Sequence, residues 1–116
     1  MSIVVYGIKS CDTMKKAFTW LDQQGLDYQF HDYKKAGAPE PEQLANWISE
    51  LGWENVINRR GTTWRKLPEQ RRQNMDADDA IKAAIENPSM IKRPLLEYDN
   101  GLLLGFNPEQ WQEKLA

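Results

Sequence analysis

The chain has 116 residues, of which 41% are hydrophobic and 28% are charged, and this is the balance of one globular domain. Its formal net charge of −2 gives no general electrostatic attraction to nucleic acid or to an anionic membrane, although a local basic patch is compatible with it. The opening apolar run is too short for a signal peptide, and no stretch approaches the roughly 20 apolar residues of a membrane span.

The first third of the chain predicts a strand, a helix and a second strand. Residues 2–6, SIVVY, are apolar and β-branched and end at Gly7, which is typical of a buried strand. From Met14 onward, apolar residues recur with the spacing of an amphipathic helix, and Gly25 suits its left-handed C-terminal cap. Residues 28–33, YQFHDY, alternate and predict a second strand, parallel to the first.

The middle of the chain, residues 41–87, predicts a mostly helical insert. Pro41 can open a helix that ends at Gly52. Residues 58–65 are polar and basic and are expected to form a loop. Two more helices are expected, one over residues 68–75 and one that has Asp76 as its N-cap and stops at Pro88.

The last part of the chain predicts a hairpin and a helix. Residues 95–98 and 102–104 are apolar runs on either side of Asp-Asn-Gly, and Asn-Gly between such runs is a strong hairpin signal. Asn107 and Pro108 are expected to begin the last helix, with its apolar side chains facing the core.

This order of elements predicts an α/β protein with a mixed four-stranded sheet in a thioredoxin-like arrangement. We expect one domain over residues 1–116, with a thioredoxin-like core of about 1–38 and 89–116 and a helical insert of about 39–88.

The only cysteine, Cys11, falls where the first strand turns into the first helix. Unpaired N–H groups and the helix dipole at that position favour a thiolate, and Lys9, Lys15 and Lys16 are close in sequence. The alternative is a buried, inert thiol, since free cysteine is often buried. The placement at the strand-to-helix turn favours the reactive thiol, because ligands meet α/β sheets there.

The absence of a second cysteine limits the chemistry. An internal disulfide is excluded, so redox turnover would need an outside thiol such as glutathione or a partner protein, and a reducing cytoplasm is the expected location. With one cysteine and one histidine, no structural metal is expected, and no bound cofactor is expected either. His31 lies in the second predicted strand and is interpreted as a packing or surface residue rather than a catalytic base.

Two basic segments could reach the thiol. Arg93 precedes Pro94 at the entry to a strand, so Arg93-Pro94 is a candidate cis peptide beside the cysteine, the alternative being an ordinary edge-strand proline. The basic loop carries Arg59, Arg60 and Arg65. It is either a solvated loop or the source of an arginine that folds over the thiol to bind an anion, for which a guanidinium is suited.

Together, the segments GIKSCDTMKKA, NRRGTTWRK and IKRPLL and the final hairpin and helix resemble the ArsC-like family over nearly the whole chain. That family includes glutaredoxin-linked arsenate reductases, Spx regulators and small YffB-type proteins, and the resemblance is closest to the YffB type. The resemblance implies that Cys11 is the nucleophile. It also implies that Arg59 and Arg93 bind the anionic partner and that Pro94 is the family's cis-proline.

Three departures from the family pattern bear on function. Gly7 stands where the arsenate reductases have a histidine, and Phe106 stands where they have a third anion-binding arginine. Met14 stands at the second cysteine of the Spx-type Cys-x-x-Cys, which excludes a disulfide switch of that kind.

The resemblance thus implies a glutathione-dependent thiol oxidoreductase, in which Cys11 is catalytic and Arg59, Arg93 and Pro94 bind the substrate. Lys9, close to Cys11 in sequence, is expected to bind there as well. One alternative is an Spx-like module that binds a protein partner such as RNA polymerase, and another is an arsenate reductase. We expect the partner to be glutathione or a small thiol or oxyanion substrate. We expect neither membrane binding nor direct binding to nucleic acid.

Overall fold

The computed structural model describes residues 2–99 and 101–116. These residues form two compact units, each with its own core. Unit 1 contains the first and last parts of the chain, Met1–Lys35 and Arg93–Ala116, and unit 2 is the segment between them, Ala36–Lys92.

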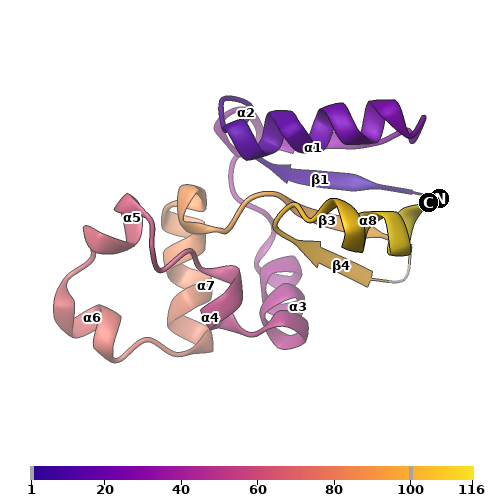
Figure 1. The fold of residues 1–116 in the computed structure, drawn as a ribbon. Coiled ribbons are helices and arrows are strands. Elements are labelled where there is room, and N and C mark those ends of the chain that lie inside the picture. Colours follow the sequence, from indigo (N-terminus) through magenta and orange to yellow (C-terminus); the bar gives the residue numbers. More distant parts are fainter. Residues whose placement is uncertain (1, 100) are drawn as a thin grey trace. The chain divides into compact units, whose positions relative to one another are not determined.

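Unit 1 is built on a four-stranded sheet of order β2-β1-β3-β4, of which Figure 1 labels β1, β3 and β4. The central strand β1 pairs in parallel with β2, as predicted, and antiparallel with β3, which in turn pairs antiparallel with β4. This is the mixed sheet of an α/β, thioredoxin-like fold. The strands are β1 (Val4–Gly7), β2 (Gln29–Asp32), β3 (Leu95–Tyr98) and β4 (Gly101–Leu104).

Helices α1 (Asp12–Gln23) and α8 (Pro108–Leu115) complete the core of unit 1. Val5 pairs with Leu96, and Leu96 pairs with Leu103, so these three side chains share one face of the sheet. Apolar side chains of the two helices pack against that face. The buried residues of this cluster are Ile3, Val5, Met14, Ala17, Leu21, Leu96, Leu103, Trp111 and Leu115.

The other face of the sheet carries polar and aromatic side chains near the C-terminal end of β1, the end that leads to Cys11. Tyr6 follows Val5 on β1 and therefore points to the opposite face. Its partner on β2 is His31, and its hydroxyl donates a hydrogen bond of 2.7 Å to Oε1 of Glu97 on β3.

Both ends of α1 have local causes in the sequence. The helix begins at Asp12, earlier than the first apolar residue Met14 suggests, because Cys11 takes the extended N-cap conformation. At the other end, Gly25 has a φ of 69° and its N–H bonds to the carbonyl of Asp22, so the predicted left-handed cap is confirmed.

The predicted boundaries of β2 and of the hairpin differ in detail from the structure. Tyr28 and Tyr33 flank β2 instead of belonging to it, and Tyr33 begins a short helix, α2 (Tyr33–Ala36). β3 and β4 pair as the two arms of a hairpin up to Tyr98 and Gly101. Asn100, at the centre of the predicted turn, lies outside the described residues.

Unit 2 is helical, with one isolated antiparallel bridge between Ile57 and Ile91. Pro41 stands in the first turn of its first helix, Gly52 caps that helix at φ 86°, and the Asp76 side chain caps α7 by accepting the N–H of Asp79, as predicted. The helices, coloured magenta to orange in Figure 1, are α3 (Pro41–Leu51), α4 (Trp53–Val56), α5 (Thr62–Arg65), α6 (Glu69–Gln73), α7 (Ala77–Glu86) and the 3-10 helix η1 (Pro88–Met90).

The prediction of a loop over residues 58–65 is wrong at its end, where α5 forms. Trp64 on α5 is only 9% exposed, and its ring lies 6.3 Å from that of Trp53, so an apolar anchor holds this basic segment in place. No helix in the described part of the chain is long and apolar enough to cross a membrane.

Candidate active site

Cys11 sits in the turn that joins the central strand to α1, at the N-cap of the helix. Its own N–H bonds to the carbonyl of Ile8 at 3.4 Å, and its carbonyl accepts the N–H of Lys15 at 3.1 Å. These two bonds close the turn and begin the helix. The half-buried thiol is thereby held where the first N–H groups of a helix have no partner within the helix.

The surroundings of the thiol favour its ionised form. Burial by itself would raise the pKa of Cys11, but the N–H groups of Met14 and Thr13, the charge of Arg93 and the Thr13 hydroxyl together lower the pKa below its ordinary value. The sulfur makes no capping hydrogen bond of standard geometry. The two N–H groups therefore act mainly as dipoles directed at the sulfur.

Strand pairing brings Arg93 to the thiol from the other end of the chain. β3 runs antiparallel to β1, so the residue before β3 lies near the end of β1 from which the Cys11 turn departs. The Arg93–Pro94 peptide bond is cis, as the sequence suggested, and Pro94 is fully buried. The carbonyl of Pro94 also accepts the N–H of Gly105 at 2.8 Å, which ties this entry to the end of β4.

The other two predicted cations of the site, Lys9 and Arg59, lie in different parts of the structure. Lys9 is exposed in the same turn as Cys11. Arg59 belongs to unit 2, where its guanidinium lies over the ring of Trp53, 5.7 Å from the ring centroid. Among the predicted cations, Arg93 is the one whose charge lowers the pKa of Cys11.

The side chain of Met14 packs directly against Gly7. Met14 is fully buried beneath the Cys11 turn, and a Cβ atom added at Gly7 would lie 2.6 Å from its sulfur and 2.7 Å from its terminal methyl. The methionine therefore fills the space that any side chain at position 7 would need. This explains why the histidine of the arsenate reductases has no room here.

His31 is held by aromatic packing, in agreement with the packing role expected from the sequence. Its ring centroid lies 5.1 Å from that of Tyr6 and 5.6 Å from that of Tyr33.

Thr13 and Tyr33 were missed by the sequence analysis. A threonine two residues after a helix N-cap is a usable signal, because its N–H and hydroxyl lie in the unpaired first turn. Tyr33 carries no such signal. It comes within range of the Arg93 charge only through the pairing of strands that are far apart in sequence.

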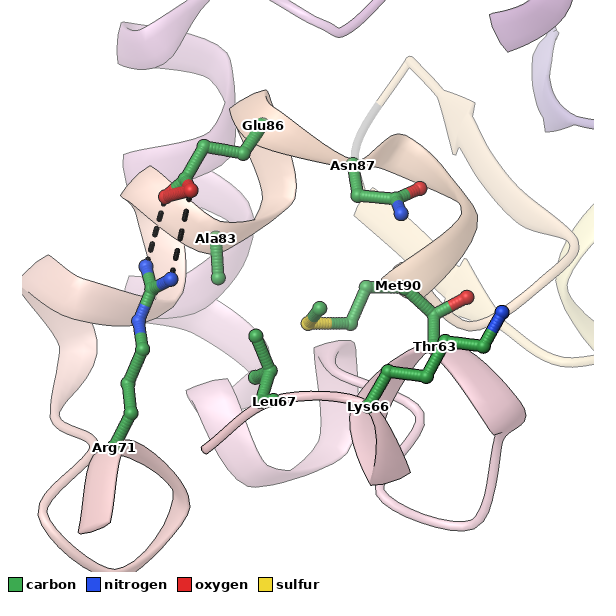
Figure 2. A pocket seen from close by; sticks show the side chains of 8 residues that line it. All are labelled: Thr63, Lys66, Leu67, Arg71, Ala83, Glu86, Asn87 and Met90. Atoms are coloured by element: carbon green, nitrogen blue, oxygen red, sulfur yellow. Dashed lines mark hydrogen bonds and ion pairs between the residues drawn. The ribbon is translucent and has the colours of Figure 1, made fainter. Parts of the chain in front are cut away.

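Unit 2 contains a separate cavity of about 250 Å³. One wall is the side chain of Arg71, which is held by the carboxylates of Asp79 at 3.1 Å and Glu86 at 2.8 Å. Figure 2 shows the Arg71 guanidinium facing the carboxylate of Glu86. This arginine is neutralised within the chain, and the lining contains no nucleophilic thiol or histidine. The lining residues are Thr63, Lys66, Leu67, Arg71, Ala83, Glu86, Asn87 and Met90.

Comparison with known sequences gives a consistent family. The model of the ArsC family matches residues 6–114. The chain is 40% identical over 114 residues to an uncharacterized protein of Haemophilus influenzae, with 98% of this chain and 99% of that protein covered. It is also 26% identical over 102 residues to the global transcriptional regulator Spx of Streptococcus pyogenes, with 87% and 75% covered.

Solved structures give the same picture. A structure of a protein named YffB is 50% identical, with a TM-score of 0.94 over 98% of this chain and 99% of that one. An arsenate-reductase-related protein of Brucella melitensis is 51% identical, with a TM-score of 0.77 over 97% and 93% of the two chains.

Proposed function

Because the chain belongs to the ArsC family, we propose that it is a thiol oxidoreductase in which Cys11 is the nucleophile and glutathione is the co-substrate. The observation that supports this proposal best is the environment of Cys11. Helix N–H groups and the charge of Arg93 lower the pKa of a half-buried thiol. Such a combination is typical of reactive cysteines and is uncommon for structural ones.

The proposed reaction is thiol–disulfide exchange on a mixed disulfide between glutathione and a substrate thiol. The Cys11 thiolate attacks the glutathione sulfur, a Cys11–glutathione disulfide forms, and the substrate leaves as a thiolate that takes up a proton. A second glutathione thiolate then attacks the glutathione sulfur of this adduct. Cys11 returns as a thiolate and glutathione disulfide leaves, so the substrate sulfur is reduced and the sulfur of the incoming glutathione is oxidised by the same amount.

The predicted cations would orient the anionic partner. Arg93 would hold a carboxylate beside the thiol, and the effect of its charge on Cys11 supports this role. Lys9, exposed in the same turn, would help to hold the thiolate, and Arg59 and Pro94 are proposed as binding residues from their match to the family. The reducing cytoplasm, the expected location, would supply the glutathione.

The test is the glutathione-dependent reduction of a glutathionylated peptide, followed through the oxidation of NADPH by glutathione reductase. We expect Cys11→Ser to abolish turnover and Arg93→Met to reduce it. The matched control is Lys16→Met, which removes an exposed cation from α1. If Cys11→Ser keeps the wild-type rate, the proposal is wrong.

The similarity to Spx supports a second candidate, a module that binds a protein partner such as RNA polymerase. A pull-down with RNA polymerase separates the two roles. Specific capture that survives Cys11→Ser would favour the regulator, and absence of capture together with lost turnover in Cys11→Ser would favour the enzyme.

A further inference from the structure

Tyr33 carries a buried hydroxyl that nothing in the described part of the chain satisfies. The residue is 5% exposed, and its Oη has no hydrogen-bond partner there. Buried side-chain hydroxyls in native proteins nearly always have a partner, so an unpaired one calls for an explanation. A ligand that is absent from the free protein is one such explanation.

The sheet places Tyr33 at the same end of its strands as Cys11 and Arg93. Tyr33 directly follows β2, and the Cys11 turn follows β1, which runs parallel to β2. Arg93 precedes β3, which runs antiparallel to β1. All three residues are therefore at one end of the sheet within unit 1, and this end is where open α/β sheets bind ligands.

The contacts around Tyr33 fix its ring and leave its hydroxyl as a donor. The ring packs edge to face against His31, with centroids 5.6 Å apart. Burial raises the pKa of Tyr33, the neighbouring Tyr6 and Glu97 raise it further, and the charge of Arg93 opposes them. The hydroxyl thus keeps its proton at neutral pH. Arg93 acts on both Tyr33 and Cys11, which links the two side chains to one cation.

We propose that the Tyr33 hydroxyl donates a hydrogen bond to a carboxylate of the thiol co-substrate that Arg93 holds beside Cys11. This inference rests on the proposed function and adds a binding residue to it. The neutral donor and the guanidinium together would bind the carboxylate. A hydroxyl kept without a partner in the free protein is then available to the ligand without first breaking a protein hydrogen bond.

The test uses the single thiol as its own reporter. Iodoacetate carries a carboxylate and iodoacetamide does not, so the ratio of their alkylation rates measures how well the site holds a carboxylate beside the sulfur, independently of the thiolate fraction. We expect Tyr33→Phe to lower this ratio about tenfold, which corresponds to a hydrogen bond to a charged group. The fold should be at least as stable, since the lost hydroxyl had no partner.

Tyr28→Phe is the control, because Tyr28 is a half-buried tyrosine at the other end of β2. A fall in the ratio with Tyr33→Phe alone supports the inference. An unchanged ratio with Tyr33→Phe, or an equal fall in both variants, overturns it.

A second measurement uses the wild-type protein. S-methylglutathione carries the carboxylates of glutathione but cannot exchange disulfides. We expect it to shift the NMR resonances of the Tyr33 ring and to leave those of Tyr28 unchanged, whereas a Tyr33 signal that stays fixed while Cys11 is protected from alkylation overturns the inference. The proposed function fails separately, if the wild-type thiol reacts with both reagents no faster than an ordinary cysteine.

Discussion

At the scale of single residues, the reactivity of Cys11 depends on groups that stabilise its thiolate. Because the pKa of Cys11 is lowered, the rate of iodoacetamide alkylation should rise with pH at a midpoint below the ordinary value of about 8.5. Arg93→Met removes a charge that favours the thiolate and should move this midpoint upward. Lys16→Met is the control, and an equal shift in both variants would contradict a specific role for Arg93.

The close approach of Gly7 and Met14 gives a second prediction at this scale. Gly7→Ala places a Cβ 2.6 Å from the Met14 sulfur and should lower the free energy of unfolding by about 1–3 kcal/mol through overpacking. Met14→Ala should lower it by about 2–5 kcal/mol through a cavity. The double variant should be more stable than the sum of the two effects implies, because the space freed at Met14 accommodates the new methyl group. Urea unfolding of the four proteins measures this coupling, and strict additivity would show that the contact is relieved elsewhere.

The residue-level site was predictable where local sequence determines it. The position of Cys11 at a helix N-cap follows from an apolar strand ending at Gly7 and a helical pattern beginning soon after it. Arg93 could be named from its place before a proline at a strand entry. Tyr33 could not, because its surroundings come from three strands that are far apart in sequence, and periodicity assigned it to a strand that ends one residue earlier.

At the scale of elements, an ion-pair cluster connects helix α6 of unit 2 to helix α7. None of its residues is buried, and Arg71 ties it to Asp79 and Glu86 on α7. Replacing the forked guanidinium with the single ammonium of Arg71→Lys should lose part of this cluster. We expect the hydrogen-exchange protection of α6 amides to fall, whereas Arg60→Lys, an exposed control in the same unit, should leave it unchanged.

The same cluster has a defined pH dependence. Arg71 lowers the pKa of Glu86, so the stabilising contribution is complete above the ordinary glutamate pKa and is lost as pH falls through the lowered value. Protection of α6 should therefore decrease on acidification in the wild type and vary less in Arg71→Lys. Equal acid sensitivity in both proteins would contradict this account.

The sequence predicts some element boundaries correctly and others wrongly. Caps gave reliable ends, since Gly25, Gly52 and Asp76 end or begin helices as predicted. The polar and basic composition of residues 58–65 predicts a loop, because only one large apolar residue, Trp64, interrupts it. The contact of Trp64 with Trp53 anchors this segment. A single tryptophan contributes little to a sequence pattern, so the pattern does not reveal this contact.

At the scale of the whole molecule, the fold class followed from the order of elements. A strand-helix-strand start and a hairpin-helix end, separated by helices, leave few arrangements for the sheet. The pairing of β1 with β3 is what joins the two ends of the chain into unit 1.

Arsenate reduction is the alternative that can be tested on the whole molecule. The resemblance to the arsenate reductases matches Phe106 to their third anion-binding arginine. The ring of Phe106 packs edge-on against Trp111, with centroids 4.9 Å apart. In an assay coupled to glutathione and glutaredoxin, we expect no arsenate-dependent NADPH oxidation beyond the Cys11→Ser background. Arsenate-dependent oxidation that disappears in Cys11→Ser would show that two arginines suffice.

The antiparallel pairing of β1 and β3 also has a consequence for protein synthesis. The N–H groups that act on Cys11 are available as soon as α1 forms, but Arg93 is synthesised only after β2 and all of unit 2. We therefore expect a nascent chain that stops short of Arg93 to carry a less acidic thiol than a chain in which β3 has joined the sheet. The full nucleophilicity of the thiol toward oxidants and alkylating agents is then acquired only after β3 has joined the sheet.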